Sequence, residues 1–105
     1  MVVLFYMNFL NERMAAMRLV MTIVGEDKVG IIAKVSNALA EDGINIININ
    51  QNIMHGFFNM VLIAEAEESK LNLKAEKEKF AALGKEIGVD IRLQSEKIFT
   101  AMHRI

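Results

Sequence analysis

The residues best suited to chemistry gather in residues 25–31, a glycine-containing loop that leads into a helical pattern. Backbone N–H groups at the start of a helix lack intrahelical partners, and together with the helix dipole they favour a bound carboxylate. Gly30 has no Cβ to hold a ligand away. Asn45 and Asn48 follow in a predicted strand, and an amide side chain can accept from an ammonium group and donate to a carboxylate. Together these residues predict a pocket for an amino acid.

A purely structural interpretation of the same residues stays open. Asp27 would then cap the helix, Gly30 would permit tight packing of the helix on a sheet, and the Asn residues would protect an edge strand from unwanted pairing. The residues alone do not decide between the two interpretations.

Catalytic chemistry has no visible apparatus in the sequence. The two His residues, His55 and His103, have no partners at a spacing typical of metal ligands, and the chain contains no Cys. No serine lies in a nucleophile motif, and neither common phosphate-binding glycine motif occurs. We therefore expect no catalytic residues, no metal site, no cofactor and no enzymatic activity.

Composition points to one folded domain without nucleic acid as a partner. The chain has 105 residues, of which 53% are hydrophobic, so it can bury a core of its own. Twelve Lys and Arg residues balance thirteen Asp and Glu residues, and the net charge of -1 supplies no basic field for phosphate backbones.

Short apolar runs bounded by turn residues predict four strands. The second run alternates Ile with Asn but shifts phase between Ile46 and Ile47, which predicts a bulge there. Met54, His55 and Gly56 predict a tight hairpin between the second and third strands. The predicted strands cover residues 18–24, 44–53, 57–65 and 89–94.

Helical spacing of apolar residues predicts two long helices, at about residues 28–42 and 73–87. Asp27 is the expected N-cap of the first, and Asn72 and Gly88 bound the second. Ser95 can cap a short final helix.

The element order is β-α-β-β-α-β, which predicts an α+β, ferredoxin-like fold with a four-stranded antiparallel sheet, both long helices on one face and a short C-terminal helix. The first and third strands are then central, and both are apolar on both faces, whereas the two edge strands carry polar residues. Because the helices cover one face, the other must be covered by the final helix, by the N-terminal residues or by a second copy. The pattern therefore predicts a homo-oligomer.

Residues 1–16 are interpreted as an N-terminal extension and residues 17–105 as the domain. The apolar residues 2–10 are too few to span a bilayer, and no Lys or Arg precedes them as in a secretory signal. We expect a cytoplasmic protein without a membrane partner, for which Met17 is a candidate biological start.

The run VGEDKVGIIAKVSNALAEDGINI, residues 24–46, resembles the glycine-containing signature of ACT domains, small ligand-sensing modules of ferredoxin-like fold. The chain is most similar to stand-alone single-ACT proteins and to one half of glycine cleavage system transcriptional repressors. In that family, amino acids bind between subunits, at the loop after the first strand and the edge strand of a neighbour. The resemblance implies a ligand site at Asp27, Val29, Gly30 and Asn45. Lys28 and Val29 replace the Arg-Pro pair of many members.

The resemblance implies a regulatory protein, a homodimer or tetramer, that binds an amino acid or similar metabolite and modulates a partner enzyme or regulator. One alternative is a protein-interaction module without a small ligand. Another is an acylphosphatase-type enzyme, which shares the topology but needs an Arg in the first loop, where this chain has Lys28.

Overall fold

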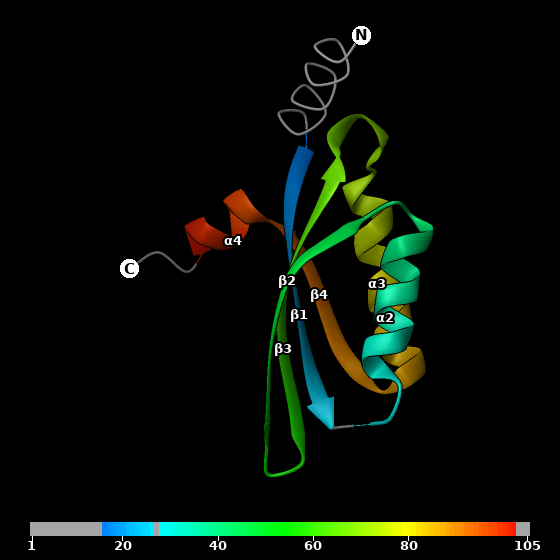
Figure 1. Ribbon diagram of the computed structural model, residues 1–105, viewed down its shortest axis with the longest axis vertical. Coiled ribbons are helices and arrows are strands. Elements are labelled where there is room, and N and C mark those ends of the chain that lie inside the picture. The colour runs from blue at the N-terminus through cyan, green and yellow to red at the C-terminus, as the bar shows by residue number, and fades with distance from the viewer. Residues whose placement is uncertain (1–15, 27, 103–105) are drawn as a thin grey trace, which may run out of the picture.

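The computed structural model describes residues 16–26 and 28–102, which build one sheet flanked by helices (Figure 1). In chain order the elements are β1 (Ala16–Glu26), α2 (Ile31–Glu41), β2 (Asn45–Met54), β3 (Phe57–Glu67), the 3-10 turn η1 (Glu68–Lys70), α3 (Leu73–Ile87), β4 (Val89–Ser95) and α4 (Glu96–Met102). The strand order is β2-β3-β1-β4 with every neighbouring pair antiparallel. The predicted ferredoxin-like fold with β1 and β3 in the centre is confirmed.

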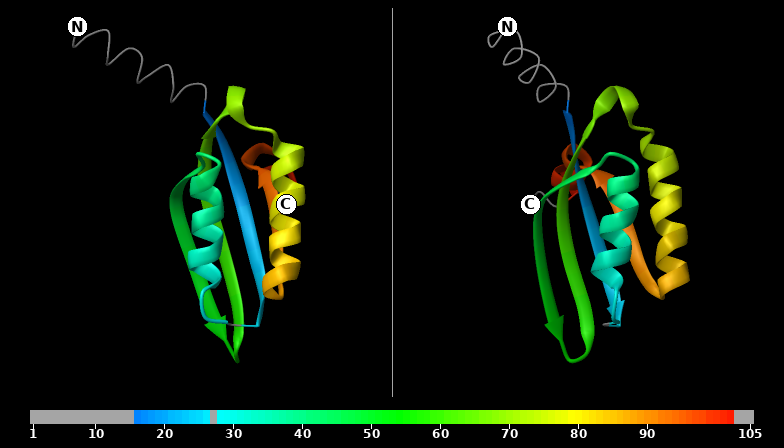
Figure 2. Two further views of the ribbon diagram at one scale, coloured as in Figure 1. Left: turned by 90° about the vertical axis from the view of Figure 1, so that its right-hand side faces the viewer. Right: turned by 45° about the vertical axis from the view of Figure 1, so that its right-hand side comes forward.

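The core lies between the sheet and the helices α2 and α3, which cover the same face (Figure 2). Strand residues that point to this face alternate with residues that point away, because side chains in a strand have a period of two. The fully buried large side chains are Leu19, Met21, Ile23, Val35, Leu39, Met60, Leu62 and Phe80.

Most predicted element ends are confirmed by local hydrogen bonds. The Asn72 side chain accepts from the Ala75 N–H at 3.1 Å at the start of α3, and Gly88 ends that helix with a left-handed φ of 79°. The Ser95 hydroxyl accepts from the Ile98 N–H at 3.2 Å at the start of α4. These ends follow from side chains next to them in sequence.

The predicted hairpin and bulge are also present. His55 and Gly56 both have positive φ, as a two-residue hairpin turn with the right twist requires. The pairing of β2 with β3 shifts register between Ile46 and Asn48, as expected for a bulge at Ile47. After the shift, Ile49, Gln51 and Ile53 share the helix-covered face, whereas Asn48, Asn50 and Asn52 lie on the opposite face, here called the open face.

The open face is partly covered by α4, which contacts β1 and β4 on the side opposite α2 and α3 (Figure 1). Val20 of β1 points to this face and is only 2% exposed. The prediction that the central strands are apolar on both faces was too simple, because the open face also carries Arg18, Thr22, Asn59 and Glu65. Within the described residues, no helix is long and apolar enough to cross a membrane.

Two predicted elements had wrong boundaries. Strand β1 is longer at both ends than residues 18–24, because it pairs with β3 along its full length from Ala16 to Glu26. Helix α2 begins at Ile31 rather than near Lys28, and its N-cap position belongs to Gly30, not to Asp27. Gly30 has a φ of 88°, a conformation that glycine adopts with little strain.

Candidate functional site

The loop after β1 delivers the chain to the start of α2 through Gly30. The Gly30 carbonyl accepts from the Lys34 N–H at 3.0 Å and so closes the first turn of the helix. Gly30 has no side chain that could cap the remaining N–H groups, and the first turn of α2 contains no acidic residue. Among the residues that the structure describes, the first turn of α2 thus places no carboxylate at the positive end of the helix, which suits an anionic ligand group.

A hollow of about 440 Å³ opens beside this helix start. It lies between α2 and the second half of β2, on the helix-covered side of the sheet, and its size is in the range of small-molecule sites. Apolar side chains dominate its wall, with Lys28 and Gln51 as the polar ones. The lining residues are Lys28, Gly30, Ile31, Ile32, Ala33, Gln51, Ile53 and Phe58.

The loop is tied to the rest of the domain through Lys28. A Cβ built on Gly88 would meet the Lys28 ammonium group, so this side chain reaches the C-terminal end of α3. A cation at a helix C-terminus interacts favourably with the helix dipole. Lys28 therefore links the wall of the hollow to α3.

The structure places three other predicted site residues, Val29, Asn45 and Asn48, apart from the hollow. Val29 is fully exposed and does not line it. Asn45 pairs with Glu65 and Asn48 with Ile63, so both Asn residues point to the open face. Asp27 lies outside the described residues.

Distance along the sheet also separates these groups within one copy. Asn45 begins β2 at one end of the sheet, whereas Gly30 follows the opposite end of β1 (Figure 1). The length of β2 between Asn45 and Ile53 spans about 25 Å. A single copy of the chain does not bring Asn45 or Asn48 to Gly30.

Sequence reasoning missed Gln51, Ile53 and Ala33 as lining residues. Gln51 shares the helix-covered face of β2 with Ile49 and Ile53. A polar residue among apolar ones on this face is the one sequence signal that could have indicated Gln51 as a site residue. Its direction depends on the bulge, because a shift of one residue moves every following side chain to the other face.

A second polar cluster joins α2 to α3 away from the hollow. The Lys79 ammonium donates to the Asp42 carboxylate at 2.7 Å and to the Ala38 carbonyl at 3.2 Å. The Lys79 hydrogen bond holds the pKa of Asp42 below its usual value. Burial, followed by hydrogen bonding to Asp42, raises the pKa of Glu76. This cluster fastens the end of α2 to α3.

The arrangement at the hollow is suited to binding rather than to bond making. Its polar groups are backbone N–H groups and the Gln51 amide, since the Lys28 ammonium lies at the end of α3, and none of them is a general base at neutral pH. His55 lies at the hairpin turn and does not line the hollow. Across residues 16–26 and 28–102, no three His, Asp or Glu side chains come together in a way that could hold a metal ion.

Comparisons with known proteins identify the family of the chain. Residues 17–94 match the ACT domain family. A UPF0237 protein from Methanosarcina acetivorans is 39% identical over 92 residues, which cover 88% of this chain and all of that protein.

Solved structures lead to the same fold. An ACT domain protein from Streptococcus pneumoniae superposes with a TM-score of 0.72 at 37% identity over 79% of this chain and 93% of that one. A putative glycine cleavage system transcriptional repressor has a TM-score of 0.67 at 21% identity over 76% of this chain and 46% of that one, a likeness of fold. With a family match that covers most of its length, a relative that aligns over its whole length and a shared fold, the chain belongs to the ACT domain family.

Proposed function

We propose that this chain is a cytoplasmic regulatory protein that binds an amino acid where two copies meet and thereby modulates a partner enzyme or regulator. ACT domains are typically regulatory, ligand-binding modules. The observation that carries the proposal is the hollow at the start of α2, which opens beside the unpaired edge of β2.

The chemistry of the hollow fits the backbone of an amino acid. The carboxylate binds at the free N–H groups at the start of α2. The side chain of the ligand lies against Ile32, Ile53 and Phe58. Within one copy, the Gln51 amide is the side chain of the hollow that can accept a hydrogen bond from the ligand's ammonium group, and further acceptors are needed.

A second copy can supply these acceptors as backbone carbonyl groups of β2, because its Asn45 and Asn48 side chains point to the open face, away from the hollow. This strand is an edge strand, and its outer N–H and C=O groups are free to pair with another strand. A two-fold axis that crosses β2 near its middle pairs it antiparallel with its own copy. That operation brings the Asn45 end of one copy to the Gly30 end of the other, so two equivalent sites form.

Such a site couples ligand binding to assembly. A ligand held by both copies binds the paired state better than the separate chains, and it therefore shifts the population towards the paired state. A partner that recognises one of the two states then responds to the amino acid.

Calorimetric titration of the full-length protein with each of the twenty amino acids tests the proposal, and we expect heat from a small subset of them. Ala33 lines the hollow, so Ala33→Phe should fill it and abolish this heat. The matched control is Ala40→Phe, at an exposed position two turns further along the same helix and outside the hollow, which should bind as the wild type does. No heat with any amino acid, or equal affinity in both variants, would contradict the proposal.

An interaction module without a small ligand is the second candidate. Exposed apolar side chains at the hairpin end of the sheet, among them Met54 and Phe57, favour it. It predicts binding of a partner protein that survives Ala33→Phe unchanged.

A further inference from the structure

The open face of the sheet is covered at one end and bare at the other. At the end near Val20, α4 lies on β1 and β4 (Figure 1). At the hairpin end, Val24, Met54 and Phe57 are 47%, 58% and 58% exposed. These three side chains are called the bare patch. With Asn52 and Asn59 they border a hollow of about 390 Å³.

Helix α4 has an exposed apolar side of its own. Phe99 is partly buried, whereas Ile98 is 53% exposed and Met102 is 63% exposed. With 100° between successive helical residues, Lys97 and Ala101 lie on the side opposite Phe99, and the exposed Ile98 lies on the flank between these two sides. The helix that covers one end of the open face therefore presents apolar surface outward as well.

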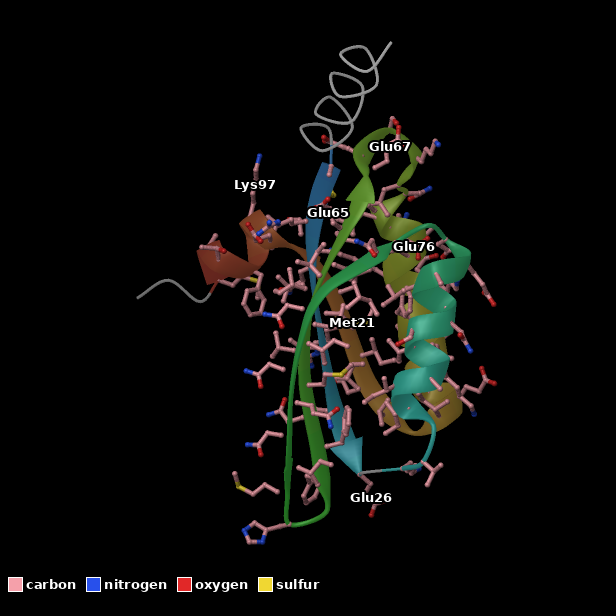
Figure 3. All side chains as sticks on the ribbon, in the orientation of Figure 1. Met21, Glu26, Glu65, Glu67, Glu76 and Lys97 are labelled. Carbon is pink, nitrogen blue, oxygen red and sulfur yellow. The ribbon has the colours of Figure 1, made fainter. Side chains whose placement is uncertain are left out.

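Charges of opposite sign accompany the two surfaces. Glu26 ends β1 beside the bare patch, because it pairs with Phe57 and shares the open face with Val24. Lys97 belongs to α4 at the other end of the sheet and points away from the bare patch (Figure 3). Both side chains are exposed, and neither forms an ion pair with another residue of the described part of the chain.

We propose that a second copy of this chain docks on the open face about a two-fold axis that runs across the strands. This operation reverses the strand direction and places α4 of each copy on the bare patch of the other. Ile98 then enters the hollow at the hairpin end, and Lys97 of one copy pairs with Glu26 of the other. Each contact occurs twice, and the two α4 helices lie side by side between the two sheets.

The charges are the reason for choosing a second copy as the occupant. An unrelated partner could cover the bare patch but would leave the outer side of α4 exposed. Only a copy of the same chain buries both apolar surfaces and pairs both charges with one axis, since the surfaces lie at opposite ends of one face. This contact does not involve the edge of β2 and stands independently of the proposed ligand site.

Charge reversal in the full-length protein tests the contact. Lys97→Glu alone and Glu26→Lys alone each replace two attractive pairs by two repulsive ones, and each should weaken the association measured by sedimentation equilibrium about tenfold. The double variant Lys97→Glu with Glu26→Lys restores both pairs with the signs exchanged and should recover the wild-type constant. The matched control is Lys77→Glu, an exposed lysine of α3 on the other side of the sheet.

Three results would overturn the proposal. They are a wild-type protein that stays monomeric at millimolar concentration, single reversals that leave the association constant unchanged, and a double variant that fails to recover the wild-type constant.

Residues 1–15 are the competing occupant of the bare patch, and they contain Tyr6, the only tyrosine of a chain without Trp. If Val24→Asp in a monomer increased the acrylamide quenching of Tyr6 fluorescence, the chain's own N-terminal segment would be the cover instead.

Discussion

Gly30 and Gly84 lack a Cβ for different structural reasons: a positive φ at Gly30 and a close backbone approach at Gly84. At Gly30 an added Cβ would have no atom within 4 Å, so the space is free and the constraint is the positive φ. A β-branched residue there would strain the backbone, and Gly30→Val would confuse loss of binding with local distortion. At Gly84 the backbone is helical, and the constraint is a close approach of α3 to β4.

Gly84→Ala should destabilise the domain although alanine is the better helix former. Helix propensity alone predicts a gain of about 1 kcal/mol in the free energy of unfolding. The new Cβ would lie 2.6 Å from the Val89 carbonyl oxygen, however, and would force α3 away from β4. We expect a net loss of about 1–2 kcal/mol in urea denaturation. Ala82→Gly, at an exposed position of the same helix, gives the propensity effect alone; a stabilised Gly84→Ala protein would show that the helix and strand can separate freely.

At the scale of elements, the polar cluster between α2 and α3 makes stability depend on pH. The pKa of Glu76 is raised from 4.5, first by burial and then by Asp42, so the folded protein binds this proton more tightly than the unfolded chain. The resulting stability is full below pH 4.5 and is lost as pH rises through the raised pKa. Asp42 acts in the opposite sense, because its pKa is lowered and its contribution is lost as pH falls below 3.8.

Glu76→Gln should therefore stabilise the protein at pH 7 and have little effect at pH 4. The amide carries no charge to be buried, and the Glu76 Oε2 atom has no hydrogen-bond partner among the described residues. We expect a gain of about 1 kcal/mol at pH 7 from urea denaturation. Lys79→Met is the comparison variant, since it removes the cation and should destabilise at pH 7. An equal gain for Glu76→Gln at both pH values would show that charge burial is not the cause.

Element ends were predictable where the determining residue is adjacent in sequence. Asn72, Gly88 and Ser95 act on their own helices through local hydrogen bonds or a positive φ, and the sequence is enough to place them. The start of α2 was not predictable in this way, because Asp27 is as good a helix cap in sequence as Gly30. The path of the chain from β1 to α2 determines where the helix starts, because it places a residue of left-handed conformation at position 30.

The candidate site was predictable only at the loop. Gly30 was identified from its type and position, and it lines the hollow. Gln51 and Ile53 were missed because their direction depends on the register of β2 after the bulge, which pairing with β3 determines. The inward side of an edge strand is thus a property of the sheet rather than of the strand sequence alone.

At the scale of the whole molecule, the two proposed contacts, one through the edge of β2 and one through the open face, use surfaces at right angles to each other. Pairing through the edge of β2 extends the sheet sideways, whereas the open-face contact stacks one sheet over another (Figure 2). A chain that uses both builds a tetramer with two kinds of two-fold axis. The two equilibria are separable by mutation, because Lys97 and Glu26 lie outside β2.

Amino-acid binding should tighten association through the β2 edge and leave the open-face contact unaffected. If each of two sites exists only in the paired state, ligand at about ten times its dissociation constant strengthens pairing about tenfold per site, or about a hundredfold in all. Sedimentation equilibrium of the Lys97→Glu protein, with and without the amino acid identified by calorimetry, isolates this effect, because the open-face contact is weakened in that variant. Ala33→Phe combined with Lys97→Glu should associate equally with and without ligand. If saturating ligand left the association of Lys97→Glu unchanged, the ligand would bind within single copies, and assembly would not transmit its signal.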